Sequence, residues 1–115
     1  MTVLIADDNA EVRRLLKARL RAIADVIVEC EDGHEAVAQY AATQPDWVLM
    51  DVEMPGLDGL QATRAIKADW PTARIVIVTN YNDAGFRAEA MAAGAYDYVL
   101  KENLRTLRQL LRSAS

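Results

Sequence analysis

The stretch WVLMDVEMPGLDG, residues 47–59, carries the main evidence for the fold. Four consecutive apolar residues run into Asp51, and Pro55 with Gly56 and Gly59 then interrupts regular structure. A continuous apolar run is typical of a strand that is buried on both faces, as in a parallel sheet covered by helices. The pattern therefore predicts a carboxylate at the point where a buried strand enters a loop.

Short apolar runs of this kind alternate with amphipathic segments along the whole chain. The expected strands are TVLIA (2–6), VIVEC (26–30), DWVLM (46–50), RIVIVT (74–79) and YDYVL (96–100). The expected helices, in which apolar residues recur at helical spacing, lie within 9–24, 33–43, 60–69, 84–94 and 104–113. We expect Asn9 to cap the first helix and Gly94 to end the fourth in a left-handed conformation.

Five strand–helix units in 115 residues predict an α/β fold with one parallel sheet between two layers of helices. We expect the strand order 2-1-3-4-5, which is that of a single-domain flavodoxin-like (βα)5 three-layer sandwich. The first and third strands are then neighbours, and the chain reverses its winding between them. Ligands of such sheets bind outside the carboxyl ends of the strands at this switch point.

The composition is that of one globular domain, which we expect to span residues 1–115. Apolar residues make up 52% and charged residues 26% of the chain. No apolar run approaches the about 18 residues that span a bilayer, so no membrane partner is expected. The single cysteine excludes an internal disulfide and suits the reducing cytoplasm. The net charge of −4 argues against direct nucleic-acid binding by this domain.

Polar side chains stand at the ends of four expected strands. Asp7 and Asp8 follow the first strand and Asp51 follows the third, while Thr79 ends the fourth and Lys101 follows the fifth. In the order 2-1-3-4-5 these four strands are consecutive in the sheet. Their carboxyl ends share one edge, so we expect the five side chains to converge in one cleft.

The chemistry of these residues points to phosphoryl transfer. Three neighbouring carboxylates repel one another, and Mg²⁺, which prefers oxygen ligands, would neutralise them. Lys101 supplies a positive charge for a phosphoryl oxygen, and Thr79 supplies a hydroxyl donor. A carboxylate nucleophile, Asp51, in such surroundings is typical of a site where positioning and charge neutralisation carry the catalysis.

With these residues in place, the sequence resembles the receiver domain of bacterial two-component response regulators over essentially its whole length. The motifs that carry the resemblance are IADDN (5–9), VLMDVEMPGLDGL (48–60), VIVTNY (76–81) and GAYDYVLK (94–101). The chain departs from the family pattern at two positions. Asn80 stands where Ala or Gly is usual, and Glu102 stands where proline is common. In having no proline after Lys101, the chain resembles the receivers of LuxR-type or NarL-like regulators.

The resemblance implies that Asp51 is the phosphoacceptor. It also implies a Mg²⁺ site, in which Mn²⁺ can substitute. Asp8 and Asp51 would bind the ion directly, Asp7 would bind it through water, and the backbone carbonyl of Glu53 would complete the protein ligands.

A switch is implied as well. Thr79 and Lys101 would contact the phosphoryl group, and Tyr98 would turn inward as Thr79 moves. The surface formed by the fourth helix, fifth strand and fifth helix would change as a result. The residues expected to tune the lifetime of the phosphorylated state, or access to Asp51, are Glu53, Asn80 and Tyr81.

In functional terms, the resemblance implies a phosphoaccepting signalling domain in a phosphorelay, with a transcriptional output. It is not an enzyme in the ordinary sense, but it catalyses its own phosphorylation and dephosphorylation. Its partners would be a histidine kinase or phosphotransfer protein, with small acyl phosphates as substitute donors. A homodimer through the switch surface is a further family expectation.

Two other hypotheses remain open on the sequence. The first is a receiver-like interaction module that works without phosphorylation, although such a module would typically lose an acid, the threonine or the lysine. The second is an aspartyl phosphatase of the haloacid dehalogenase type, which requires a D-x-D nucleophile after the first strand. Here the first strand is followed by DD, and the candidate nucleophile, Asp51, follows the third strand.

We expect the chain to be either a stand-alone receiver or the front half of a longer regulator.

Overall fold

The computed structural model describes residues 1–113, so residues 114 and 115 of the predicted domain lie outside the described residues. Five strands form one sheet: β1 (Thr2–Ala6), β2 (Val26–Cys30), β3 (Trp47–Met50), β4 (Ile75–Thr79) and β5 (Asp97–Leu100). All neighbouring strands are parallel, and their order is β2-β1-β3-β4-β5. The predicted strand order is confirmed.

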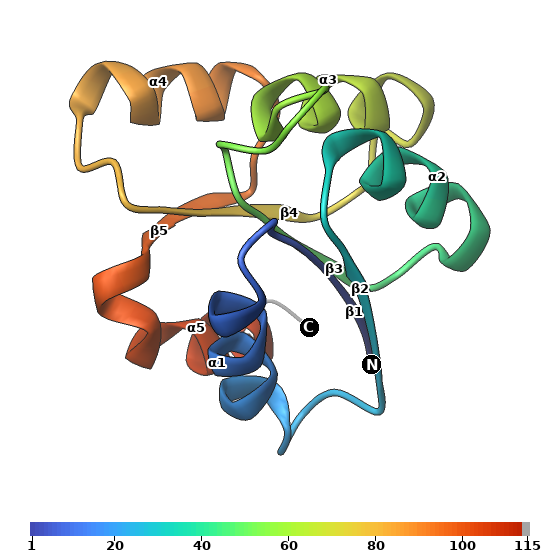
Figure 1. Cartoon of the computed structure of the whole chain (residues 1–115), viewed down its shortest axis with the longest axis vertical. Coiled ribbons are helices and arrows are strands. Elements are labelled where there is room, and N and C mark those ends of the chain that lie inside the picture. Colours follow the sequence, from blue (N-terminus) through green and yellow to red (C-terminus); the bar gives the residue numbers. More distant parts are fainter. Residues whose placement is uncertain (114–115) are drawn as a thin grey trace.

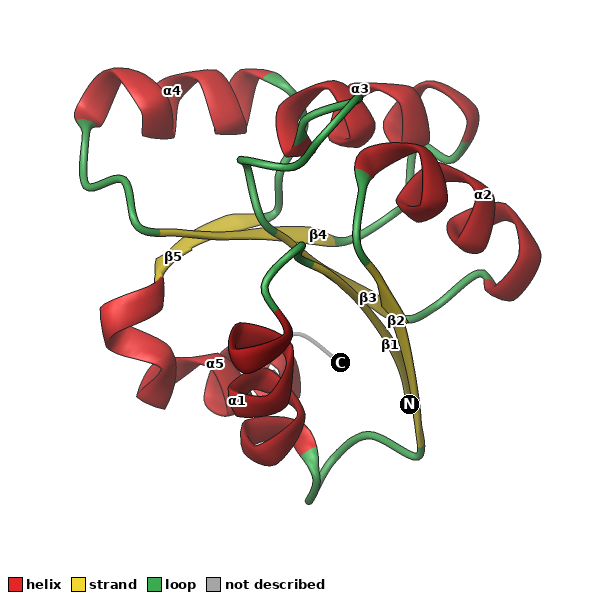
Figure 2. Cartoon of the chain, in the orientation of Figure 1, coloured by secondary structure: helices red, strands yellow, loops and turns green. Residues whose placement is uncertain are grey.

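Helices cover both faces of the sheet. They are α1 (Ala10–Leu20), α2 (Gly33–Thr43), α3 (Gly59–Asp69), α4 (Ala84–Ala92), the 3₁₀ helix η1 (Lys101–Thr106) and α5 (Leu107–Ser113). α2, α3 and α4 lie on one face, and α1 and α5 lie on the other (Figures 1 and 2). The predicted three-layer sandwich is therefore confirmed. No helix in residues 1–113 has the length and apolar character needed to cross a membrane.

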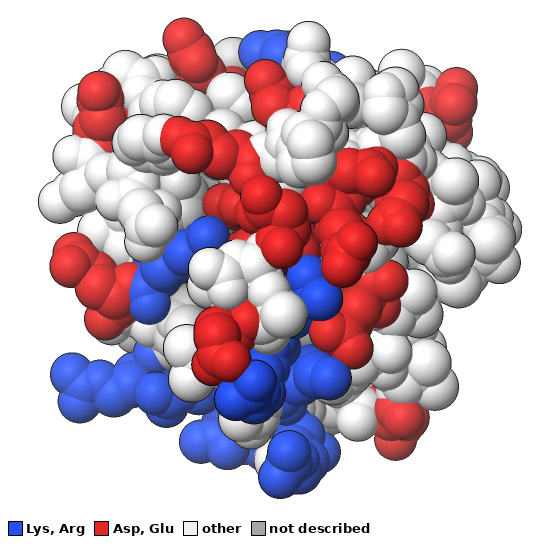
Figure 3. Space-filling model, in the orientation of Figure 1, with Lys and Arg blue, Asp and Glu red and all other residues white. Residues whose placement is uncertain are grey.

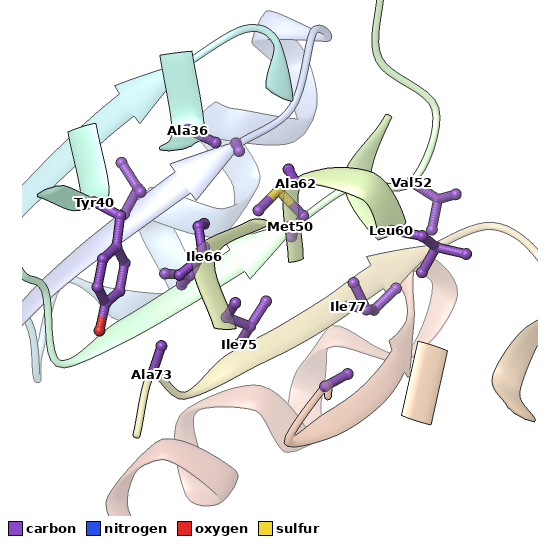
Figure 4. Close-up of a cluster of buried hydrophobic side chains, with 14 of the residues drawn as sticks. Ala36, Tyr40, Met50, Val52, Leu60, Ala62, Ile66, Ala73, Ile75 and Ile77 are labelled. Atoms are coloured by element: carbon purple, nitrogen blue, oxygen red, sulfur yellow. The ribbon is translucent and has the colours of Figure 1, made fainter. Parts of the chain in front are cut away.

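The central strands β1, β3 and β4 are buried on both faces, as their continuous apolar runs predict. Under α3, Met50 of β3 and Ile75 and Ile77 of β4 lie in one buried cluster with Ile66 of the helix (Figure 4). On the opposite face, Leu49 packs in a second cluster with Leu107 of α5. Full burial of one such side chain contributes about 1.5–3 kcal/mol, so the sheet is held rigidly between its helices.

The ends of the helices follow local sequence signals. The Asn9 side chain accepts hydrogen bonds from the first backbone N–H groups of α1, which confirms the predicted N-cap. Asp58 and Gln61 form a capping box at the start of α3. Gly94, which follows α4, has a φ of 103°, so the predicted positive-φ position is confirmed.

Two predicted helix boundaries are wrong. The last segment does not begin as an α-helix at Leu104, because residues 101–106 form η1 and α5 begins at Leu107. Leu104, Leu107 and Leu111 are all buried, and their spacings of three and four residues fit either helix type. α1 ends at Leu20, so Ile23 lies in the following turn, although it still packs against the cluster under α1.

Candidate functional site

The two acids after β1 have different surroundings. Asp7 is buried, and its backbone N–H donates to the carbonyl of Cys30 at the end of β2 (3.1 Å). Its carbonyl accepts a hydrogen bond from Nη1 of Arg13 on α1 (2.7 Å), and its Oδ1 accepts one from the N–H of Asn9 (2.8 Å). Asp8 is exposed. Asp7 is thus fixed in the interior, while Asp8 faces solvent.

Asp51 follows β3 and is 6% exposed. Its backbone N–H donates to the carbonyl of Ala6 (2.8 Å), which continues the pairing of β3 with β1. Gly59, at the start of α3, packs against it so closely that a Cβ there would lie 1.8 Å from the Asp51 carbonyl oxygen. Only glycine permits this approach of two backbones. Gly59 is therefore needed for the loop between β3 and α3 to pack closely against the backbone of Asp51.

The side chains from the separate strand ends converge as predicted. Carboxylate oxygens of Asp7, Asp8 and Asp51 lie within 4.8 Å of one another. Lys101 Nζ lies 3.0 Å from Asp7 Oδ2 and 3.2 Å from Asp51 Oδ1. Acidic atoms gather over this part of the surface, whereas Lys and Arg atoms gather over α1 and α5 (Figure 3). One lysine thus pairs with two of the three clustered carboxylates, and the site keeps an excess of negative charge.

This arrangement shifts the pKa values of both partners. Burial, and then the charge of Asp7, raises the pKa of Asp51 to about 6, although Lys101 acts in the opposite direction. For Lys101, burial acts to lower the pKa, but the hydrogen bond to Asp7 and the charges of both acids outweigh it and raise the pKa. At neutral pH the lysine therefore stays protonated, and the Asp51 carboxylate is available as a nucleophile.

The acidic cluster fits a divalent cation. Among the described residues, the buried Oδ2 of Asp7 meets no donor other than the ammonium group of Lys101 (3.0 Å), which it shares with Asp51. One lysine compensates two buried carboxylates incompletely, and such buried charge costs free energy. A hard cation would satisfy it and neutralise its neighbours, and Mg²⁺ prefers one or two carboxylates together with water.

Thr79 and Tyr98 lie behind the acidic cluster and are linked through one backbone segment. Thr79 is the last residue of β4 and is buried, and its Oγ1 accepts a hydrogen bond from the N–H of Tyr81 (3.2 Å). Tyr98 of β5 is also buried, and its hydroxyl donates to the carbonyl of Tyr81. Burial raises the pKa of this phenol. The Tyr98 ring therefore points inward and is tied to the segment after Thr79.

A cleft of about 830 Å³ opens at this edge of the sheet. It is lined by Asp8, Asn9, Asp51, Val52, Glu53, Met54, Pro55, Asp58, Thr79, Asn80, Tyr81, Phe86 and Lys101. Every site residue expected from the sequence lines this cleft except Asp7 and Tyr98, which are buried. Glu53, Asn80 and Tyr81 are exposed at its mouth.

Two residues of the site were not expected from the sequence. Arg13 of α1 donates a hydrogen bond to the Asp7 carbonyl. Its side chain also reaches the end of β2, where it contacts Glu29 (Nε to Oε1, 3.0 Å) and Glu31 (Nη2 to Oε1, 3.6 Å). Phe86 stacks on Tyr81. Neither forms a motif with the strand-end residues, because both reach the site from helices.

Residues 3–112 match the family model of the response regulator receiver domain. The fold and the cleft agree with this match, and the chain belongs to that family. It is a receiver domain of two-component response regulators, which are signalling domains rather than classical enzymes. The family assignment does not favour the phosphorylation-independent module, and it gives no support to the phosphatase hypothesis.

Individual relatives agree with this assignment. The chain is 38% identical over 104 residues to the transcriptional regulatory protein YxjL of Bacillus subtilis, covering 89% of this chain and 48% of that protein. It is 33% identical over 102 residues to the chemotaxis protein CheY of Listeria monocytogenes, covering 88% and 86%. A two-component response regulator of the LuxR family from Aurantimonas superimposes with a TM-score of 0.87 at 31% identity, covering 97% and 85%.

These matches also bear on the type of regulator. Glu102 in place of proline after Lys101 indicated a resemblance to LuxR-type receivers. The similarity to a LuxR-family structure confirms this resemblance. The chain spans about half the length of the transcriptional regulators that it matches.

Proposed function

We propose that this domain, residues 1–115, accepts a phosphoryl group on Asp51 from a histidine kinase or phosphotransfer protein. The observation that carries the proposal is the buried Asp51 carboxylate, which lies 3.2 Å from Lys101 Nζ and close to two further acids at the floor of an open cleft. The domain catalyses its own phosphorylation and dephosphorylation at this residue.

Asp8, Asp51 and the Glu53 carbonyl would hold Mg²⁺, or Mn²⁺ in its place, and Asp7 would bind it through water. When bound, the ion neutralises charge on the transferred phosphoryl group and on the carboxylates. Asp51 supplies the attacking oxygen, and Lys101 meets a phosphoryl oxygen with its ammonium group. The rigid ends of β1, β3 and β5 hold these groups in place before the donor arrives.

Phosphorylation adds charge and acceptor oxygens next to Lys101 and Thr79. The Thr79 hydroxyl turns toward the phosphoryl group. It thereby gives up the hydrogen bond that its Oγ1 accepts from the N–H of Tyr81 in this structure. Tyr98, bonded to the carbonyl of the same residue, moves with that segment. The local event thereby changes the surface of α4, β5 and α5, which includes a groove of about 280 Å³.

The remaining parts of the proposal concern the cellular setting. The domain works in the cytoplasm, and it neither binds nucleic acid directly nor enters a membrane. It dimerises through α4, β5 and α5 and controls a transcriptional output, as the names of several relatives suggest. Glu53, Asn80 and Tyr81, at the mouth of the cleft, tune the lifetime of the phosphorylated state and access to Asp51.

The test is the intact mass of the chain after incubation with acetyl phosphate and Mg²⁺, beside Asp51→Asn. We expect the native chain to gain one phosphoryl group and the variant to gain none. Asp58→Asn is the matched control, because Asp58 lines the same cleft and Asn also caps a helix well. It should be phosphorylated like the native chain. Equal labelling of native chain and Asp51→Asn would refute the assignment of the acceptor.

A further inference from the structure

The edge strand β2 differs from the other four strands in its relation to the cleft. Among residues 1–113, the side chains that line the cleft follow β1, β3, β4 and β5, and none comes from β2. Its end nevertheless reaches the site through the backbone, because the N–H of Asp7 donates to the carbonyl of Cys30 (3.1 Å). β2 is thus in direct contact with the turn that carries two of the three clustered acids, Asp7 and Asp8.

A second connection between β2 and this turn runs through Arg13, in the first turn of α1. Its Nη1 donates to the Asp7 carbonyl (2.7 Å), and its Nε donates to Oε1 of Glu29 on β2 (3.0 Å). The Arg13 side chain is only 12% exposed, so both charge-assisted hydrogen bonds form largely away from water. One rigid guanidinium group therefore links the carboxylate on β2 to the carbonyl of the turn.

Glu29 is held from its other side by Lys17, which lies one turn further along α1. The Lys17 Nζ donates to the second carboxylate oxygen, Oε2 (3.0 Å). This hydrogen bond, together with the hydrogen bond and charge of Arg13, lowers the pKa of Glu29, although burial acts in the opposite direction. The ionised carboxylate thus keeps the Arg13 guanidinium in the orientation in which Nη1 faces the Asp7 carbonyl.

The Asp7 carbonyl matters for the metal site because it belongs to the peptide unit between Asp7 and Asp8. Since this unit is planar, its orientation determines the direction in which the backbone enters Asp8. The N–H of Asp7 is held by Cys30 and its C=O by Arg13, so both backbone groups of this residue are anchored. Groups that orient metal ligands in this way typically change metal affinity by about tenfold to a hundredfold.

We propose that Glu29 is a positioning residue for the metal site, which acts on the turn between Asp7 and Asp8 through Arg13. The inference rests on the proposed Mg²⁺ site. Glu29 orients the guanidinium, and the guanidinium orients the turn that presents the two acids. The fifth strand of the sheet thereby contributes to a cleft that its own side chains do not line.

A double-mutant cycle tests the link between Glu29 and Arg13. Titration calorimetry measures the Mg²⁺ affinity of the native chain, Glu29→Ala, Arg13→Gln and the double variant at about 0.15 M salt, where long-range attraction is screened. Glu29→Ala should weaken binding about fivefold and Arg13→Gln about tenfold, because the first variant keeps the hydrogen bond to the carbonyl but not its orientation.

The double variant decides how Glu29 acts. Its loss should stay at about tenfold, because Glu29 has no further effect once Arg13 is gone. Independent effects of the two residues would instead multiply to about fiftyfold. That result, or a native affinity in Glu29→Ala, would overturn the inference.

Glu31→Ala is the matched control. Glu31 also faces Arg13 (Nη2 to Oε1, 3.6 Å), but its side chain is 68% exposed, so this pair contributes little. The variant removes the same charge close to Arg13, and its Mg²⁺ affinity should stay close to that of the native chain. Equal losses in Glu31→Ala and Glu29→Ala would mean that the acids attract the cation only over distance, and the positioning role would be refuted.

Urea unfolding of the same variants separates positioning from stability. If Glu29→Ala lowered the midpoint of unfolding but bound Mg²⁺ like the native chain, Glu29 would be a structural residue only. Glu29→Gln keeps a neutral acceptor for Arg13 and serves for the cycle where Glu29→Ala does not fold. Failure of the native chain itself to bind Mg²⁺ would instead overturn the proposed metal site.

Discussion

The two edges of the sheet treat their carboxylates in opposite ways. At the amino-terminal edge, Asp25 forms an ion pair with the N-terminal amino group (2.5 Å) and is 86% exposed. Asp46 accepts a hydrogen bond from the N–H of Thr2 (2.7 Å). At the carboxyl-terminal edge, two buried acids, Asp7 and Asp51, share Lys101, and Asp8 lies beside them.

The pKa shifts follow this contrast. A hydrogen bond to the N-terminal amino group lowers the pKa of Asp25, whereas burial and the charge of Asp7 raise the pKa of Asp51 to about 6. The ionised form of an aspartate side chain is thus stabilised at the amino-terminal edge and destabilised at the carboxyl-terminal edge. The protein therefore gives up folding free energy at the edge where we propose that phosphoryl transfer takes place, and four changes test this contrast.

The largest effect is expected from Lys101→Met in the metal-free protein. The substitution leaves two buried carboxylates without their cation, so the free energy of unfolding at pH 8 should fall by about 3 kcal/mol. Urea denaturation monitored by circular dichroism measures it. Lys101→Arg keeps the charge and should lose much less. If the methionine variant were as stable as the native chain, Lys101 would not compensate the cluster.

Asp51→Asn should have the opposite sign. The folded pKa of about 6 exceeds the unfolded value of about 3.9, so the folded state binds more protons between these values. The stabilising effect of protonation is complete below about pH 4 and is lost as the pH rises through 6. At pH 8, without metal, the variant should therefore be about 2 kcal/mol more stable than the native chain.

The pH dependence of this difference is its decisive feature. Denaturation series at pH 4, 6 and 8 should show the two proteins converging at the lowest pH. A constant difference across the range would mean that the carboxamide changes packing rather than charge, and the electrostatic account of Asp51 would fail.

Arg13→Gln should weaken Mg²⁺ binding about tenfold, in line with losses measured for groups that orient metal ligands. Arg13 holds the Asp7 carbonyl at 2.7 Å, and the variant frees the turn that presents Asp7 and Asp8. Titration calorimetry measures the affinity. Lys17→Gln is the matched control, because Lys17 contacts Glu29 (3.0 Å) as Arg13 does but not the turn. Similar losses in both variants would assign the effect to Glu29 instead.

The smallest effect belongs to Asp25→Asn at the opposite edge. The pair with the N-terminal amino group is exposed to solvent, and ion pairs of this kind contribute little. The midpoint of urea unfolding should not change measurably at pH 7. A clear shift would show that the amino-terminal edge also depends on its charges, and the contrast between the edges would weaken.

Much of this architecture could be predicted because its signals are local. Continuous apolar runs marked the strands, and residues such as Asn9 and Gly94 marked helix ends. The predicted start of an α-helix at Leu104 was wrong, because buried leucines three and four residues apart fit both a 3₁₀ helix and an α-helix. The five strand-end residues could be located once the strand order was inferred, since parallel strands bring their carboxyl ends to one edge.

The fold class, the strand order and the convergence of the five strand-end side chains could all be predicted from the amino-acid sequence. Three features emerge only when the chain folds: Arg13 holds the Asp7 carbonyl, Phe86 stacks on Tyr81, and burial outweighs Lys101 in setting the pKa of Asp51. The physical reason is that strand periodicity and turn chemistry act over a few residues. Side-chain contacts and desolvation depend on how elements distant in the chain pack together.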